Sequence, residues 1–468
     1  MNISKSFLAG LVIVGLVSMT IGYGTMAFFT DSEKATGNEL QAGTIDIMVN
    51  DGNPWKETFN LNDIKASEMY QKYSNVTITN VGTNDARVCK VINITGYDGG
   101  AHPVSEQATD PDNTVNKISA AIEYWLSVEI YDEDGNLVEE NELLSGHLLL
   151  GIDGEEYVLG VIPPGGWANV TQRYHMFNET TNWAQGDNMT FDMTFIAQQV
   201  NDPDACGTCK TIETMYLSDS GPGGEGADDG TRIFEVVLDD EDTRAYLNQL
   251  THVNSGEFDQ VDSLSASLDG KELYLYDKDT KKLGTYDLIN ETFTVEDITD
   301  SDIDDLNGVV LGAVNPEDGL IYAADDGSDK LLTINSSNLN VEVLGELDID
   351  VQGADLIFDA QGILILYTNA DNAFYEIDIE NLTGDELVTP SPSPDYFTGI
   401  SIREAGNGDL VGSTNGFNGA DGYIWTVDRD SGVAVGYEPY IGMTPHTVGY
   451  GDMAVGVLCT SIDDTPNN

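Results

Sequence analysis

The runs Glu272-Leu-Tyr-Leu-Tyr276, Lys282-Leu-Gly-Thr-Tyr-Asp-Leu288 and Thr292-Phe-Thr-Val-Glu296 decide the fold of the second half of the chain. The runs are short, contain aromatic and β-branched residues and are separated by turn residues, as β-strands are. A similar run at residues 261–268 precedes them, and the turn Asp269-Gly270 joins it to the first. Together the four runs predict one antiparallel sheet of four strands.

The same four-strand unit recurs further along the chain. Corresponding runs begin near residues 309, 354 and 398, and each copy has a glycine in its first hairpin turn. These glycines are 49, 43 and 46 residues apart: Gly270, Gly319, Gly362 and Gly408. A period of about 45 residues with four strands per unit is typical of a β-propeller blade.

A further blade is expected from the two ends of this half. Residues 452–458 can supply its inner strand, and residues 214–217, 232–238 and 245–250 its other three strands. Such a blade closes the ring and leaves no free sheet edge. We therefore predict a propeller of about five blades over residues 211–460, with an open sandwich of the same strands as the alternative.

The first half, residues 28–202, also consists of short alternating runs. The run Gly43-Thr-Ile-Asp-Ile-Met-Val-Asn50 is an example, and the turn Asp51-Gly52 follows it. This pattern predicts an antiparallel β-sandwich, so the whole chain is expected to be all-β. Residues 203–210, with a Cys-x-x-Cys motif, are expected to link the two bodies, and residues 461–468 to form an acidic tail.

The composition excludes several classes of function. The chain has 468 residues, with 81 Asp plus Glu against 19 Lys plus Arg, a net charge of −62. Binding to nucleic acid or to anionic lipid through a basic face is therefore not expected. The hydrophobic fraction of 40% is nevertheless large enough for substantial cores. Such acidity favours an extracellular or halophilic protein, whose surroundings screen the self-repulsion.

The amino terminus indicates export. Lys5 precedes an apolar run at residues 7–26, and the small residues of Thr25-Met26-Ala27 end it. This is the pattern of a signal peptide over residues 1–27, cleaved after Ala27. An uncleaved anchor helix is the alternative, and the membrane is then a partner only through this segment. We expect a secreted or cell-surface protein.

Two further residue types agree with export. Asn-x-Ser/Thr sequons, which can carry glycans, occur at Asn75, Asn93, Asn169, Asn178, Asn188, Asn290, Asn335 and Asn381. The four cysteines are an even set that an exported protein normally pairs: Cys89, Cys206, Cys209 and Cys459. Ring closure predicts that Cys459 pairs with Cys206 or Cys209, which leaves the other for Cys89. A redox or zinc Cys-x-x-Cys is the alternative.

The start of the chain resembles a known family. The segment Gly24-Thr-Met-Ala-Phe-Phe-Thr-Asp-Ser-Glu33, then Gln41-Ala-Gly-Thr-Ile-Asp-Ile47 and Val76-Thr-Ile-Thr-Asn-Val-Gly-Thr83, is similar to the TasA/camelysin family. The resemblance covers about 170 residues. It implies a jelly-roll fold and an extracellular fibre, biofilm or matrix subunit that is held by a strand passed between neighbours.

In such a subunit, the strand passed to the neighbour is the mature amino terminus. Phe28, Phe29, Thr30 and Asp31 are the candidate donor strand, which can lie along the open edge of the next subunit and place an aromatic ring in its core. The partner is then a second copy of the chain, together with other surface or matrix components. Pairing of the same segment with its own sandwich is the alternative.

Residues that could carry chemistry are few. The five histidines are scattered and no His-Glu-x-x-His occurs, so the zinc motif of a camelysin-type metallopeptidase is missing. No catalytic residue and no cofactor is predicted. Calcium is possible at two acidic turns, whose simpler interpretation is a solvated hairpin: Asp132, Asp134 and Asn136 in one, Asp325 and Asp329 in the other.

Two classes of function follow. The first is a structural surface protein whose sandwich polymerises and whose propeller serves adhesion or ligand recognition. The alternative is an exported hydrolase or lyase with its site in the propeller mouth. Convergence of His446, Arg403 and carboxylates at the ring axis is the feature expected of the enzyme.

Overall fold

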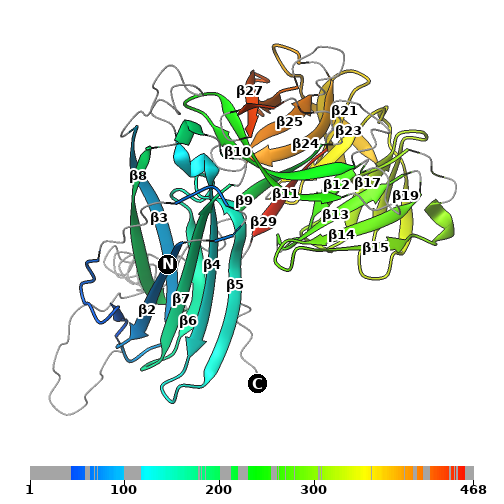
Figure 1. The fold of residues 1–468 in the computed structure, drawn as a ribbon. Coiled ribbons are helices and arrows are strands. Elements are labelled where there is room, and N and C mark those ends of the chain that lie inside the picture. The colour runs from blue at the N-terminus through cyan, green and yellow to red at the C-terminus, as the bar shows by residue number, and fades with distance from the viewer. Residues whose placement is uncertain are drawn as a thin grey trace, which may run out of the picture.

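The computed structural model describes residues 44–458, except for 58–63, 100–116, 201–211, 220–229, 254–260, 404–407, 415–421 and a number of shorter gaps. The predicted all-β class is confirmed, because the only helical elements among these residues are three short 3-10 turns (Figure 1). No helix among them is long and apolar enough to cross a membrane. The expected signal peptide and acidic tail lie outside the described residues.

The first half forms two antiparallel sheets. One has the strand order β1-β2-β7-β4-β5 and the other β6-β3-β8. The strands of the first sheet are β1 (Ile47–Val49), β2 (Lys72–Asn80), β7 (Trp167–Met176), β4 (Ile122–Tyr131) and β5 (Leu137–Leu148). Those of the second are β6 (Glu156–Ile162), β3 (Ala86–Asp98) and β8 (Asn188–Gln199).

Alternation along the strands creates the core between these sheets. In β2, Val76 and Ile78 are buried while Asn75 and Thr77 are exposed. Val76 lies opposite Val170 of β7, which in turn lies opposite Val128 of β4. The apolar positions of neighbouring strands therefore fall on one face, which packs toward the second sheet.

The second half begins with three separate four-stranded sheets, whose strands follow the chain. They are β12 (Ser263–Ala266), β13 (Glu272–Asp277), β14 (Lys282–Asp287) and β15 (Thr292–Asp297); β16 (Val309–Val314), β17 (Ile321–Asp325), β18 (Lys330–Ile334) and β19 (Val341–Glu346); and β20 (Asp355–Phe358), β21 (Leu364–Thr368), β22 (Ala373–Asp378) and β23 (Thr383–Val388). The hairpin glycines Gly270, Gly319 and Gly362 all have positive φ, as does Gly408 in the next sheet, which explains why glycine recurs there.

The remaining strands form one larger sheet. Its order is β24-β25-β26-β27-β11-β10-β9-β29, with a short strand β28 (Thr444–Pro445) beside β27. The strands are β24 (Phe397–Arg403), β25 (Asp409–Thr414), β26 (Ile424–Val427), β27 (Ala434–Ile441), β9 (Ile212–Asp219), β10 (Thr231–Asp239), β11 (Arg244–Val253) and β29 (Met453–Leu458). Two four-strand units are joined here by the parallel pair β11–β27, which the repeat alone did not predict.

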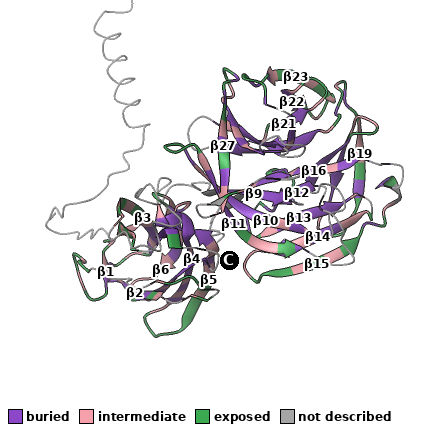
Figure 2. Ribbon diagram, turned by 45° about the horizontal axis from the view of Figure 1, so that its top comes forward, coloured by how far each residue is buried: buried purple, intermediate pink, exposed green. Residues whose placement is uncertain are grey.

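The two ends of the second half meet in this sheet. Strand β29 pairs with β9 from Met453↔Leu217 to Leu458↔Ile212, which is the pairing expected from the sequence. The first strands of the units then contact one another in the order β12, β16, β20, β24, β29, and β29 contacts β12 again. Apolar side chains pack between successive sheets, and Figure 2 shows that the inner strands of these sheets, such as β12 and β16, are largely buried.

Candidate functional site

Strand β8 is an edge of the three-stranded sheet. It pairs with β3 along its whole length, from Ala86↔Gln199 to Asp98↔Asn188. Within the described part of the chain, no strand lies on its other side. Such an edge presents a row of backbone N–H and C=O groups that can pair with a further strand.

The inward side chains of this edge strand are incompletely covered. Alternate apolar residues of β8 face the sandwich core, yet all are only half-buried: Met189, Phe191, Met193, Phe195 and Ala197. Their partners on β3, such as Val88 and Ile92, are fully buried. Apolar surface therefore remains to be covered along this edge.

The segment predicted to cover such an edge lies outside the described residues. Phe28, Phe29, Thr30 and Asp31 precede residue 44, where the described part of the chain begins. Their role as a donor strand stays a prediction. The acceptor edge was not identified from the sequence, although the alternation over residues 189–196 placed a strand there.

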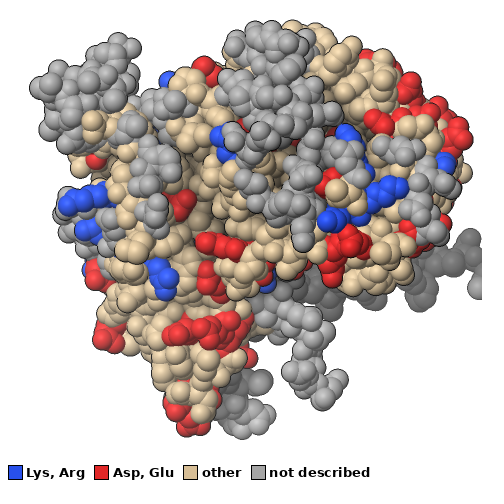
Figure 3. Space-filling view, turned by 45° about the vertical axis from the view of Figure 1, so that its right-hand side comes forward, with Lys and Arg blue, Asp and Glu red and all other residues tan. Residues whose placement is uncertain are grey.

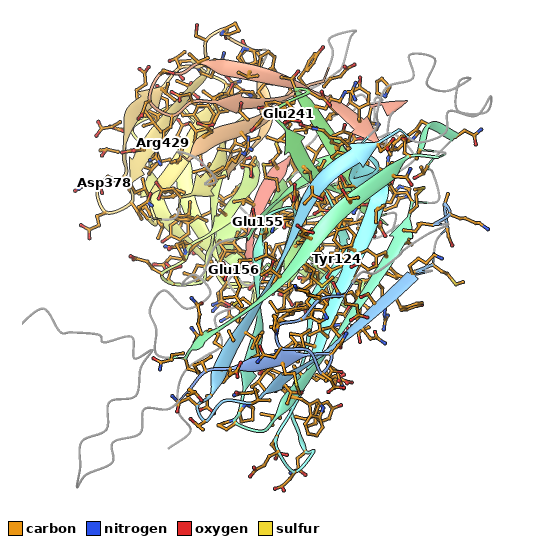
Figure 4. The ribbon with its side chains drawn as sticks, turned by 90° about the vertical axis from the view of Figure 1, so that its left-hand side faces the viewer. Tyr124, Glu155, Glu156, Glu241, Asp378 and Arg429 are labelled. Atoms are coloured by element: carbon orange, nitrogen blue, oxygen red, sulfur yellow. The ribbon has the colours of Figure 1, made fainter. Side chains whose placement is uncertain are left out.

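A buried polar network lies beneath β8. The Nζ of Lys90 donates to the hydroxyl of Tyr124 at 2.8 Å, and that hydroxyl donates to Oε1 of Gln172 at 2.9 Å. Gln172 in turn lies 3.5 Å from the sulfur of Met193 on β8. Figure 4 shows Tyr124 inside the sandwich. Complete burial lowers the pKa of the Lys90 amine well below its ordinary value. Sequence reasoning missed this lysine, although its inward position follows from the alternation with Val88 and Ile92.

The two halves meet in a second buried polar cluster. The carboxylate of Glu235 on β10 accepts a hydrogen bond from the backbone N–H of Leu148 at 3.0 Å and one from Nδ2 of Asn248 at 3.2 Å. Its other oxygen lies 3.0 Å from Nδ1 of His147. Asn248 also donates to the carbonyl of Gly146 at 2.6 Å. The cluster fixes the end of β5 against β10 and β11.

A half-buried lysine completes this junction. Lys117 donates to Asp239 at 2.6 Å and to Glu241 at 3.0 Å. Hydrogen bonds and attraction from these carboxylates outweigh desolvation and raise the pKa of the lysine. Figure 4 places Glu241 where the two halves meet. Elsewhere the visible surface carries many more acidic than basic side chains, in keeping with the net charge (Figure 3).

The residues expected of an enzyme site do not come together. Nε2 of His446 lies 2.9 Å from Asp219, while Arg403 binds Asp240 through both terminal nitrogens, at 2.8 and 3.0 Å. Asp219 follows Ser218, which bonds to Asp452 at the start of β29. On β24, Gly399 lies against Asp452, and Arg403 ends the strand four residues further on, which corresponds to roughly 13 Å. The two basic side chains therefore occupy opposite ends of the inner strands.

The cysteine predictions are only partly placed. Cys89 is fully buried in β3, and the described residues contain no free cysteine. Cys206, Cys209 and Cys459 lie outside the described residues. The pairing of Cys459 with one of the two others stays a prediction, although β29 and β9 do bring the adjoining backbone together.

The calcium candidates cap turns. One carboxylate oxygen of Asp132 accepts the N–H groups of Asp134 and Asn136, and the other accepts the side-chain amide of Asn136. Asp325 accepts from the N–H of Gly308, and Asp329 from that of Val351. The bonds of Asp132 lie within its own hairpin turn, whereas those of Asp325 and Asp329 join the turn to neighbouring segments. Calcium binding at either cluster stays a prediction.

The sequons differ in accessibility. The asparagines that are exposed are Asn75, Asn93, Asn188, Asn290 and Asn381, and the half-buried ones are Asn169 and Asn335. Asn178 lies outside the described residues. Glycan occupancy at these positions stays a prediction.

The amino-terminal segment matches a known family. A family model described as camelysin metallo-endopeptidase matches residues 2–113. This match supports the TasA/camelysin resemblance for that segment, which is about a quarter of the chain. Among curated proteins, none matches the chain.

Several solved structures are distantly similar. They include a chain of a nidogen/laminin complex (11% identity, 53% of this chain and 99% of that chain, TM-score 0.35) and hydrazine synthase of Kuenenia stuttgartiensis (15%, 40% and 50%, 0.25). A protein of unknown function from Bacteroides thetaiotaomicron is similar at 11% identity over 85% of this chain and 94% of that chain, with a TM-score of 0.34. At such low TM-scores these likenesses add nothing on function.

The description of the matched family implies a metal ion. Zinc in a peptidase needs three protein ligands, usually histidines and carboxylates. Within the described ranges, no group of three His, Cys, Asp or Glu side chains is placed to hold a metal ion. The described residues therefore do not fit such a centre, and we derive no zinc chemistry for this chain.

Proposed function

We propose that this protein is a secreted or cell-surface structural subunit that assembles by strand exchange. In this proposal, residues 28–36 of one mature copy add to β8 of the next copy. The observation that carries it is the edge of β8, which has no second partner among the described strands and whose inward apolar side chains are half-buried.

The strand order supports an acceptor role for this edge. The orders β2-β7-β4-β5 and β6-β3-β8 are those of an eight-stranded jelly roll from which the first strand, beside β8, is missing. The described strand β1 pairs with β2 in the other sheet instead. A jelly roll completed in trans therefore needs one extended segment next to β8.

The chemistry of the amino terminus suits that place. Residues 28–36 read Phe-Phe-Thr-Asp-Ser-Glu-Lys-Ala-Thr, with two aromatic rings at the tip. Either ring can cover the apolar surface near Phe191 and Phe195, while the backbone pairs with β8. Main-chain hydrogen bonds to β8 would supply the affinity, and the position of the aromatic tip would fix the register of the added strand against β8. Head-to-tail repetition of this contact produces a filament.

The second half is proposed to be the displayed part. Five units of four strands, with inner strands in a closed cycle, support its interpretation as a five-bladed β-propeller. The polar junction around Glu235 would hold this head in a fixed orientation on each subunit. We propose adhesion or ligand recognition as its role.

The test compares two exported forms by electron microscopy. The chain of residues 28–468 is expected to form filaments, and the chain that begins at Thr36 is expected to stay monomeric. A synthetic peptide of residues 28–36 should bind the truncated chain and should not bind the longer one once it has polymerised. Equal polymerisation of both chains would overturn the proposal.

Self-pairing predicts a different result from the same samples. If residues 28–36 pair with their own β8, their removal lowers stability because half-buried apolar surface is uncovered, and assembly does not change. The filament count therefore separates the two arrangements.

A further inference from the structure

Two aspartates lie face to face inside the ring of inner strands. Asp355 is the first residue of β20, and Asp452 immediately precedes β29. Each is only 3% exposed. In the cycle of inner strands, β24 lies between β20 and β29, and the two aspartates contact its residues Ile400 and Gly399 from either side. Gly399 packs against the Cα of Asp452, and the next residue, Ile400, donates to Asp355, which places the two carboxyl groups within reach of one another for a hydrogen bond.

Each carboxyl group also holds the backbone of the unit that follows it. Asp355 accepts the N–H of Ile400 on β24 at 2.6 Å, and Asp452 accepts the N–H of Leu264 on β12 at 2.5 Å. The pair therefore joins four of the five inner strands: β20, β24, β29 and β12.

The backbone of Asp452 is held as well. Its N–H donates to Oγ of Ser218 at 2.9 Å, and its carbonyl accepts the N–H of Ser218 at 2.8 Å. Ser218 belongs to β9, so Asp452 stands where the carboxy-terminal strand joins the amino-terminal strand of this half. Closure of the ring depends on this residue.

A hydrogen bond between two carboxyl groups requires one proton, because two carboxylates offer only acceptors. Burial, followed by the charge of Asp355, raises the pKa of Asp452 well above its usual range. Burial also raises the pKa of Asp355 to about 7. Asp452 is therefore the protonated member that donates to Asp355 near neutral pH.

Few other charges act on the pair. The inner strands β12, β16 and β24 carry Ser263, Val310 and Gly399 at the same height in the ring as the two aspartates. None of these three residues titrates. On β9, Asp219 beside Ser218 is paired with His446. On β21, Tyr367 lies opposite Asp355 and donates its hydroxyl proton to Asn372.

We propose that Asp355 and Asp452 form a proton-dependent clasp that closes the ring and releases the carboxy-terminal strand β29 when the shared proton is lost. With the proton, the pair carries a single negative charge that two backbone amides stabilise. Without it, two negative charges face each other with little water between them, and their repulsion is strong.

The sign of the pH dependence follows from proton counts. The unfolded aspartates, with an ordinary pKa near 3.9, release their protons above about pH 4. The folded pair keeps its proton to higher pH, so its contribution to stability is complete below about pH 4. That contribution falls as the pH rises through about 7 and beyond. The clasp is closed in acid and neutral media and open in alkaline media.

The test measures backbone hydrogen exchange in β29 and β9 of the mature full chain at pH 5 and pH 9. Rates are divided by the intrinsic rate at each pH. In the wild type, the protection of residues 453–456 is expected to fall about tenfold or more between the two pH values, since one pKa unit corresponds to a tenfold change. In Asp452→Asn, the amide can donate to Asp355 at every pH and keep its oxygen for Leu264, so only Asp355 still titrates and protection should fall less between the two pH values than in the wild type.

The controls distinguish the clasp from general effects of charge. Protection in β4 and β7 of the first half should not follow the same curve. In addition, infrared difference titration of the wild type should show buried protonated carboxyl groups that disappear in alkaline medium, and the signal should be weaker in Asp452→Asn, which keeps only Asp355. If Asp452→Asn does not fold, the infrared titration of the wild type is by itself the test of the proposed clasp. Protection of β29 that is independent of pH, or a wild type without a protonated carboxyl at pH 6, would overturn the proposal.

Discussion

Nδ1 of His147, near the end of β5, lies 3.0 Å from a carboxylate oxygen of Glu235 on β10, although 88 residues separate them in the chain. Both side chains are almost completely buried. The contact joins the sandwich to the ring of sheets and is continued by the backbone amide of Leu148. A buried carboxylate with three donors around it is expected to define the orientation of the two halves.

Glu235→Ala is therefore expected to loosen the junction. It removes the acceptor of His147, Leu148 and Asn248 and leaves their buried donors without this partner, which costs about 1–3 kcal/mol per unsatisfied group. The unfolding midpoint should fall, and small-angle scattering should show a broader distribution of distances between the halves.

Glu241→Ala is the matched control for this junction. Its side chain is 85% exposed although it also binds Lys117. Because solvent screens such a pair, the effect on stability should be small. If both variants leave the scattering profile unchanged, Glu235 does not orient the halves.

Lys90→Met should cost little or even stabilise the protein. A methionine can fill the site of a fully buried amine without its desolvation penalty. Tyr124 still donates to Gln172 after the change, so no donor is left unpaired. At pH 6 the variant should unfold at a higher denaturant concentration than the wild type.

The pH dependence of this difference has a definite sign. Burial lowers the pKa of Lys90, so the folded protein binds fewer protons than the unfolded chain between that value and about 10.4. Wild-type stability attributable to Lys90 therefore rises with pH over this range, and the advantage of Lys90→Met should shrink toward pH 10. A difference that does not change between pH 6 and pH 10 would contradict this account.

Lys117→Met is the contrast to Lys90→Met, since it leaves the buried Asp239 without this partner and should destabilise the protein.

These residues also show what the sequence could and could not predict. The alternation of apolar and polar residues and the spacing of Gly270 and Gly319 were sufficient for the all-β class and for the four-strand units, because strand period and turn conformation are local properties. The partner of Glu235 could not be found in this way. Contacts such as His147–Glu235 and Asp355–Asp452 depend on how sheets pack across long distances in the chain, and no local pattern encodes that packing.

Gly399→Ala is expected to break the ring closure. An added Cβ would overlap the backbone nitrogen of Met453 and the Cα of Asp452, so β24 and β29 must move apart. Neither obstacle is the flexible end of a side chain, and we expect a loss of several kcal/mol, about the upper range for overpacking. Thermal unfolding and exchange in β29 measure it.

Gly319→Ala is the control for the effect of replacing a glycine by alanine where no steric clash results. Its φ is +72°, and an added Cβ would have nothing within 4 Å. The cost is then the conformational strain alone, about 1 kcal/mol. An equal loss in both variants would mean that close packing of β24 on β29 is not what Gly399 serves.

Assembly should depend strongly on salt. The chain carries a net charge of −62, so copies that approach one another repel unless cations screen them. The screening length falls from about 30 Å at 0.01 M salt to about 3 Å at 1 M. Filament formation by residues 28–468, followed by light scattering, is therefore expected to rise steeply over this range. The chain that begins at Thr36 should remain monomeric at every salt concentration, because screening alone supplies no strand for β8. Salt-induced polymerisation of both chains alike would show that charge neutralisation, and not strand addition, drives their association.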